Sequence, residues 1–230
     1  MEKVKITLPG TANFFVEESY KFLRTNLQFC GPDIRVIAVT SCYENEGKTT
    51  VSLSLAKSFA ELGKKTLLVD CDMRKSVLAT QSVIGGKGQG LSEMLSGMVD
   101  NVNDIIYSTS VPNMYVLLAG QYPPNPVELL SGKLFASIIA ACRNSFDYII
   151  LDTPPLGAVS DAAVIAPRCD GTLLVFGRRK LNRRIAVNVV EQLQKSGTPL
   201  LGVVRNDATS KKKERWFGAQ QQSYYRGNYY

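Results

Sequence analysis

The alternation of short apolar runs with longer segments of helical periodicity constrains this fold most. We expect the apolar runs to be strands, and they lie at 35–40, 66–70, 114–118, 148–152, 172–176 and 200–204. Segments with helical apolar spacing lie between them, at 49–62, 132–143 and 183–195. Several runs, such as Tyr-Ile-Ile-Leu, are apolar at every position, which is typical of strands buried on both faces of a parallel sheet. We therefore predict an α/β fold with a three-layer, doubly wound, mostly parallel sheet.

Length and composition fit one domain. The chain has 230 residues, 45% of them hydrophobic, which is enough for a full core. We expect the domain to span residues 1–207, with a helix at about 13–29 before the first strand, and residues 208–230 to form a flexible, tyrosine-rich tail. No run reaches the ~18 consecutive apolar residues that a transmembrane helix needs. No signal-peptide core follows Met1, so the sequence predicts a cytoplasmic protein.

Several classes of function are excluded or disfavoured by composition. The chain contains no histidine, which excludes Ser-His-Asp and Cys-His catalysis and histidine metal ligands. Its five cysteines form no Cys-x-x-Cys pair, which indicates reduced thiols rather than a metal site. The net charge of +7 would suit nucleic acid. However, no helix-turn-helix, zinc or aromatic RNA-binding pattern accompanies the basic clusters, so we expect no nucleic-acid partner.

A phosphate-binding sequence follows the first predicted strand. It reads Cys-Tyr-Glu-Asn-Glu-Gly-Lys-Thr over residues 42–49, and a helical pattern comes directly after it. In such a loop the backbone N–H groups surround a phosphate, the lysine reaches the β- and γ-phosphates and the threonine hydroxyl holds Mg²⁺. Cys42 occupies the position of the usual first glycine. The sequence predicts a nucleotide site at Glu44, Asn45, Glu46, Gly47, Lys48, Thr49 and Thr50.

Polar side chains also stand at the ends of three other predicted strands. Asp70 and Asp72 end one strand, Asp152 ends another and Asn206 follows the last. Ligands of doubly wound folds bind at the carboxyl ends of the strands, so we expect these groups beside the phosphate loop. An aspartate such as Asp152 binds Mg²⁺ through water. Of Asp70 and Asp72, one could orient the water shell of the metal and the other could accept a proton. Asn206 could pair with a base edge, although alone it would be only a turn residue.

These motifs resemble those of the bacterial P-loop protein-tyrosine kinases (BY-kinases), especially the separate cytoplasmic kinases of capsule and exopolysaccharide operons in Gram-positive bacteria. The resemblance spans nearly the whole chain. It is carried by the phosphate loop, by Asp-x-Asp-x-Arg at residues 70–74, and by residues 120–130, 148–155 and 202–206. It implies an ATP-dependent tyrosine kinase of the P-loop NTPase type that regulates capsular or exopolysaccharide synthesis and export.

The resemblance also implies roles for individual residues. Lys48 would bind the β- and γ-phosphates, and Thr49 and Asp152 would hold Mg²⁺. Asp72 would belong to the metal site as well and would take the tyrosine proton, and Asp70 would support the metal and nucleotide. Asn206 lies where related ATPases contact adenine.

The same resemblance implies a function for the tyrosine-rich end. Tyr224, Tyr225, Tyr229 and Tyr230 lie within the last seven residues, where the family carries autophosphorylation clusters. Each phosphate adds roughly −1.5 to −2 charges, so four would add about −6 to −8. That change is large enough to cancel the net charge of +7. We expect this tail to be phosphorylated in trans.

The opening helix carries Glu18, Lys21 and Arg24 at spacings of three, which places them near one face. In the family, a Glu-x-x-Arg-x-x-Arg motif at this place assembles the subunits into a ring. Lys21 departs from the motif, and lysine lacks the planar fork of arginine. A merely solvated face is the other interpretation.

Partners and rival functions complete the prediction. The resemblance implies a separate membrane protein whose cytoplasmic segment activates the kinase and recruits it to the inner face of the plasma membrane. It also implies protein tyrosine substrates and a cognate tyrosine phosphatase. One rival is an ATPase of the partitioning and septum-positioning type, but Tyr43 occupies the place of the extra lysine of that group. Another is an ATP-binding scaffold without kinase activity, which the retained Lys48, Asp72 and Asp152 disfavour.

Overall fold

The computed structural model describes residues 5–6, 14–78, 82–83, 88–177 and 182–206. Its helices are α1 (Phe14–Phe29), α2 (Lys48–Glu61), α4 (Leu91–Leu95), α5 (Pro126–Ser131), α6 (Lys133–Arg143), α7 (Asp161–Ile165) and α8 (Arg183–Lys195), with 3₁₀ turns η1 (Val102–Asp104) and η2 (Ala166–Arg168). Its strands are β1 (Lys5–Ile6), β2 (Val36–Ser41), β3 (Thr66–Asp70), β4 (Ser82–Val83), β5 (Ile106–Ser108), β6 (Met114–Leu117), β7 (Tyr148–Asp152), β8 (Gly171–Phe176) and β9 (Leu200–Arg205).

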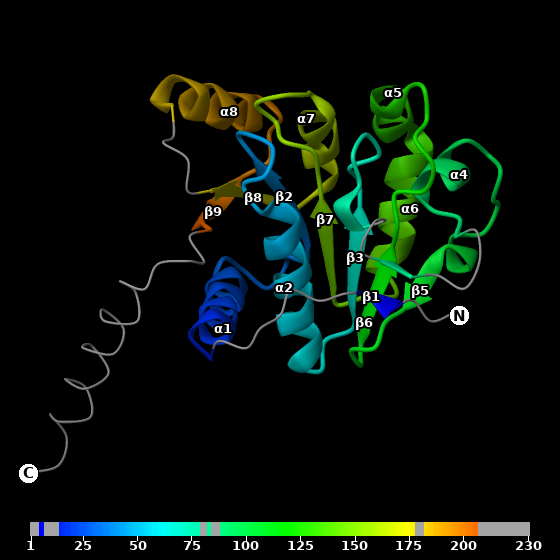
Figure 1. Cartoon of the computed structure of the whole chain (residues 1–230), viewed down its shortest axis with the longest axis horizontal. Coiled ribbons are helices and arrows are strands. Elements are labelled where there is room, and N and C mark those ends of the chain that lie inside the picture. Colours follow the sequence, from blue (N-terminus) through cyan, green and yellow to red (C-terminus); the bar gives the residue numbers. More distant parts are fainter. Residues whose placement is uncertain (1–4, 7–13, 79–81, 84–87, 178–181, 207–230) are drawn as a thin grey trace, which may run out of the picture.

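A seven-stranded sheet forms the centre of the fold, with the order β5-β6-β3-β7-β2-β8-β9. The pairs from β6 to β9 are parallel, and β5 pairs antiparallel with β6 at the edge. β1 and β4 form a separate antiparallel pair. The mostly parallel sheet with helices on both sides confirms the predicted fold class (Figure 1).

Helices cover both faces of the sheet. Helices α1 and α2 lie on one face, where a buried cluster joins side chains such as Leu27 and Phe59 to β2, β3, β7 and β8. On the other face α4, α5 and α6 pack through side chains such as Phe135, and α7 and α8 continue the layer over β8. Strands β2, β3 and β7 are buried almost throughout, because they lie in the middle of these three layers.

The six predicted strands and the four predicted helices correspond to β2, β3, β6, β7, β8, β9, α1, α2, α6 and α8, within one or two residues. The shorter elements, among them the antiparallel β5, were not predicted from the sequence. In the part of the chain that the structure describes, no helix combines the length and apolar character needed to cross a membrane. Residues 208–230 lie outside the described residues, so the division into a domain and a tail stays a prediction.

Candidate active site

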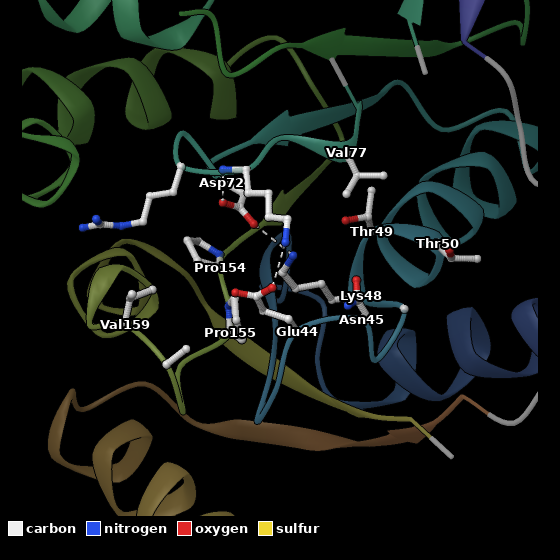
Figure 2. A pocket seen from close by; sticks show the side chains of 14 residues that line it. Glu44, Asn45, Lys48, Thr49, Thr50, Asp72, Val77, Pro154, Pro155 and Val159 are labelled. Atoms are coloured by element: carbon white, nitrogen blue, oxygen red, sulfur yellow. Dashed lines mark hydrogen bonds and ion pairs between the residues drawn. The ribbon is translucent and has the colours of Figure 1, made fainter. Parts of the chain in front are cut away.

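A cavity of about 310 Å³ opens at the carboxyl ends of β2, β3 and β7 (Figure 2). The parallel register sets Asp70 directly opposite Asp152 on neighbouring strands, and the phosphate loop follows the strand beside them. The cavity is lined by Glu44, Asn45, Gly47, Lys48, Thr49, Thr50, Asp72, Arg74, Lys75, Val77, Pro154, Pro155, Ala158 and Val159. The edge predicted from the strand ends is therefore the place where the motifs meet.

Left-handed backbone conformations shape the phosphate loop. Asn45 has φ 62° and Gly47 has φ 84°, and Gly47 forms the N-cap of α2. A Cβ atom at Gly47 would lie 1.9 Å from Nδ2 of Asn206, so both the conformation and the space require glycine there. The Asn206 side-chain amide donates to the carbonyl of Glu46 at 3.1 Å and ties β9 to the loop.

Glu46 supports the loop from behind. Its side chain is buried, and its Oε2 accepts the backbone N–H groups of Cys42 and Tyr43 at 2.9 Å each. Its Oε1 accepts the N–H of Gly177, after β8, at 3.3 Å. Glu46 and Asn206 are absent from the cavity lining, while the other predicted loop residues border the cavity. Any direct contact of Glu46 or Asn206 with a nucleotide stays a prediction.

Lys48 and Asp72 form an ion pair in the cavity. Lys48 Nζ lies 3.1 Å from Asp72 Oδ2, and both side chains are almost buried. Figure 2 shows the two side chains pointing toward each other from α2 and from the segment after β3. Although burial lowers the pKa of Lys48, the charges of Asp152 and Asp72 raise it further, so the ammonium stays protonated. The lysine and the predicted proton acceptor are therefore in direct contact.

Two further carboxylates lie beneath this pair. Asp152 accepts hydrogen bonds from the hydroxyls of Ser52, at 3.1 Å, and Thr49. Asp70 accepts the Ser76 hydroxyl and, at 3.1 Å, the backbone N–H of Asp72. Burial raises the pKa of both carboxyls, and the nearby charge of Asp152 raises that of Asp70 further. The charge of Lys48 opposes the effect of burial on Asp152, so the ammonium lies among several buried carboxyl groups beside the phosphate loop.

Ser52 is a site residue that the sequence analysis missed. It lies one helical turn after Lys48, and its hydroxyl also donates to the Lys48 carbonyl at 2.9 Å. A hydroxyl four residues after the phosphate-loop lysine was the available signal, since positions i and i+4 share a helix face.

Two other ion pairs border the cavity. Arg74 Nε lies 3.0 Å from Asp161 Oδ1, and Asp161 is buried at the start of α7. Lys75 Nζ lies 2.9 Å from Glu44 Oε2, and this pair is exposed. The Lys75 backbone N–H donates to Asp72 Oδ1 at 3.0 Å. Neither pair was predicted, because each joins loops that are distant in sequence.

The far side of the cavity is apolar. It is formed by the segment between β7 and α7, which contributes Pro154, Pro155, Ala158 and Val159. Thr40 fixes this segment by donating its hydroxyl to the Pro154 carbonyl at 2.9 Å, and Leu156 returns an N–H to the Ser41 carbonyl. The wall is therefore anchored on β2, the strand that leads into the phosphate loop.

The predicted assembly residues lie far from this cavity, on α1. Glu18 and Lys21 form an exposed ion pair at 2.7 Å. Arg24 instead donates to the Ser58 carbonyl of α2 at 2.6 Å and is half-buried. The three residues are thus not equally available to a partner. The four tail tyrosines lie outside the described residues.

The donor set fits Mg²⁺ bound together with a nucleotide. No cluster of three or more Asp, Glu, Cys or His side chains in the described ranges could hold a metal ion alone. Mg²⁺ in nucleotide sites uses one or two carboxylates together with phosphate oxygens and water. Thr49 and Asp152, joined by a hydrogen bond, offer a hydroxyl and a buried carboxylate beside the loop.

Comparison with known proteins gives consistent matches. Residues 34–169 match the family described as AAA domain. The chain is 45% identical over 190 residues to the tyrosine-protein kinase CpsD of Streptococcus agalactiae, covering 83% of this chain and 82% of that protein. The chimerical protein CapA2B2 matches in structure with a TM-score of 0.81 and 29% identity, covering 91% of this chain and 94% of that one.

Solved structures also separate the two P-loop alternatives. The kinase domain of the Escherichia coli tyrosine kinase ETK matches with a TM-score of 0.77 and 30% identity, over 85% of this chain and 77% of that one. The cell division ATPase MinD of Pyrococcus furiosus matches with a TM-score of 0.65 and 29% identity, over 78% of this chain and 75% of that one. The likeness to the kinase domain is therefore greater in shape and in extent.

Proposed function

Because this chain belongs to the family of bacterial P-loop tyrosine-protein kinases, we propose that it transfers the terminal phosphoryl group of ATP to the hydroxyl of protein tyrosines. The contact between Lys48 and Asp72 carries this proposal, because it joins a phosphate-binding cation and a proton acceptor in one cavity. Phosphoryl transfer needs little covalent work from the protein, mainly positioning and charge neutralisation.

The transfer step uses the Lys48–Asp72 pair in sequence. Lys48 Nζ donates a hydrogen bond to Asp72 in the structure. The phosphates of ATP compete for Lys48, which leaves the Asp72 carboxylate able to accept a proton. The phenol oxygen then attacks the γ-phosphorus, the bond from that phosphorus to the bridging oxygen of ADP breaks, and the phenol proton passes to Asp72. Because a phenol has a pKa of about 10, such a base matters.

Nucleotide and metal occupy the loop side of the cavity. The backbone N–H groups at Gly47, Lys48 and Thr49 surround the phosphates, as at other helix N-termini. Thr49 and Asp152, with Asp72 nearby, hold Mg²⁺, which neutralises phosphate charge when bound. Asp70 supports this group from the neighbouring strand.

The acceptor tyrosine enters on the opposite side. The apolar wall of Pro154, Pro155, Ala158 and Val159 borders the same cavity as Asp72 and offers an apolar surface for a phenol ring. An aromatic ring buried there removes apolar area from water while its hydroxyl remains polar. Tyr224, Tyr225, Tyr229 and Tyr230 are the proposed acceptors, reached in trans from a neighbouring subunit.

Assembly uses the exposed side of α1. Phe14, Phe22 and Phe29 are 60%, 69% and 82% exposed, and spacings of eight and seven residues keep them near one helix face. A row of exposed aromatic side chains on one face favours a protein contact. We expect Phe22→Ser to reduce the size of the oligomer in light scattering. An unchanged oligomer would place the contact elsewhere.

The biological setting follows from the resemblance. A membrane protein on a separate chain supplies an activating cytoplasmic segment and recruits the kinase to the inner face of the plasma membrane. The kinase regulates capsular or exopolysaccharide synthesis and export there, and a cognate tyrosine phosphatase reverses its action.

Comparison of wild type with Asp72→Asn tests the transfer step. We expect the variant to bind Mg–ATP but to form no phosphotyrosine, because an amide cannot accept the phenol proton. Unimpaired phosphorylation by the variant would refute the role of Asp72. Hydrolysis of ATP by wild type without any phosphotyrosine, with the activating segment present, would favour the ATPase alternative.

A further inference from the structure

Three cationic side chains line the cavity in the described part of the chain, and each is paired with one carboxylate. The pairs are Lys48–Asp72, Arg74–Asp161 and Lys75–Glu44. The carboxylates of the first two pairs are at most 7% exposed, whereas that of Glu44 is 56% exposed. Lys75 is thus the lysine whose partner can leave the cavity into water most easily.

The backbone of Lys75 is fixed while its side chain reaches across the opening. Its N–H donates to Asp72 Oδ1, and Lys48 contacts the other oxygen of the same carboxylate. Its ammonium meets Glu44 in the phosphate loop, at 2.9 Å, and the Lys75 side chain is 72% exposed. Figure 2 shows Glu44 among the residues that line the cavity, with a dashed line that marks its contact with Lys75.

A triphosphate changes the balance of this pair. Its negative charges repel the Glu44 carboxylate and attract the Lys75 ammonium over the same few ångströms. An exposed ion pair contributes little net stability, so separating Lys75 from Glu44 costs little. A charge-assisted hydrogen bond to phosphate inside the cavity is stronger than the exposed pair that it replaces.

We propose that Lys75 is a second phosphate-binding lysine, that its ion pair with Glu44 gives way when ATP binds, and that it turns onto the terminal phosphoryl group of ATP. This inference rests on the proposed function, which sets ATP in the cavity. Lys75 contacts the γ-phosphate because its backbone is bound to Asp72, the group next to the reacting oxygen. Glu44 thereby holds the Lys75 ammonium in place until a triphosphate binds.

The proposal predicts that Lys75 distinguishes triphosphate from diphosphate. Dissociation constants would be measured for Mg–AMP-PNP and Mg–ADP by calorimetry on the full chain. We expect Lys75→Met to weaken AMP-PNP binding by about tenfold, which equals about 1.4 kcal/mol, and to change ADP binding by less than about twofold. Lys75→Arg keeps the charge and should restore most of the AMP-PNP affinity.

Glu44→Gln tests the restraint. Loss of the carboxylate removes both the pair and the repulsion, so AMP-PNP should bind several-fold more tightly than to wild type. The double variant Glu44→Gln/Lys75→Met should keep only the part of that gain that comes from the lost repulsion, because the rest acts through Lys75. Lys57→Met is the matched control. Lys57 Nζ lies 3.4 Å from Glu61 Oε1 on α2, and neither residue lines the cavity. It should leave both constants unchanged.

Each contrary result has a distinct meaning. Equal weakening of both nucleotides by Lys75→Met, or no weakening of either, would overturn the contact with the terminal phosphate. Weaker AMP-PNP binding to Glu44→Gln would overturn the restraint. If wild type binds nucleotides with the predicted pattern but phosphorylates nothing, the proposed kinase function fails and this inference stands. If wild type binds neither nucleotide, both fail.

Discussion

Glu46 allows a sharp test of how the phosphate loop is held. Sequence placed this residue among the nucleotide-binding positions, but its buried carboxylate accepts three backbone N–H groups from within the chain. Truncation to alanine removes all three bonds. A buried donor left without a partner costs about 1–3 kcal/mol, so we expect Glu46→Ala to lower the free energy of unfolding by about 3–5 kcal/mol.

Glu46→Gln should lower the free energy of unfolding less than Glu46→Ala does. A glutamine keeps one acceptor oxygen, which can still bind the N–H groups of Cys42 and Tyr43, while its amino group faces the N–H of Gly177. The bond to Gly177 is the longest of the three, at 3.3 Å. We therefore expect a loss of about 1–2 kcal/mol for glutamine. Both variants should also weaken nucleotide binding, and alanine should weaken it more than glutamine, because the amides that surround the phosphate are less well fixed.

Urea unfolding followed by circular dichroism would give the free energies, and calorimetry would give the affinity for Mg–ADP. Glu191→Ala, an exposed glutamate on α8, is the control and should match wild type in both. The reasoning is wrong if Glu46→Ala unfolds at the urea concentration of wild type yet no longer binds nucleotide. Glu46 would then act on the nucleotide directly.

Three other perturbations test the core, the acceptor side and the start of strand β2. Phe59→Ala, at a fully buried ring, should lower the free energy of unfolding by about 3–5 kcal/mol in urea. Val159→Asp should raise the KM for a tyrosine peptide and leave the Kd for Mg–ADP unchanged, whereas Val187→Asp, exposed on α8, should change neither. Burial alone would raise the pKa of Asp170, but hydrogen bonds from Arg143 and two backbone amides lower it below its usual value. This carboxylate therefore stabilises the fold above about pH 4, and the contribution disappears as pH falls further. Asp170→Asn should remove this part of the pH dependence of the free energy of unfolding, measured in urea at a series of pH values.

Much of the fold could be predicted because the long helices carry a periodic signal and the buried strands are continuous apolar runs. The continuous apolar runs of β3 and β7 are buried on both faces, as their composition indicates. A helix of five residues, such as α7, is too short to show a helical period, and β5 has only three residues, so both depend on their neighbours for stability. Their absence from the prediction therefore reflects the lack of a local pattern, which the continuous apolar runs of the predicted strands supply.

The site was predictable where it follows strand ends and unpredictable where loops meet. Lys48 and Asp72 converge because β2 and β3 end at the same edge of the sheet. The pair of Arg74 with Asp161 spans 87 residues and depends on how α7 packs. The inward orientation of Glu46 depends on β8 in the same way. Contacts of this kind require the tertiary arrangement.

Intact-mass analysis with peptide mapping, after incubation with Mg²⁺ and ATP, tests the central claim most directly. Wild type and Lys48→Met would be compared with and without the cytoplasmic segment of the activator. We expect phosphate on tyrosines of residues 224–230 in wild type, and none in the variant, because Lys48 is needed to bind the transferred group. Equal phosphate on both proteins, or none on wild type with the activator present, would contradict it.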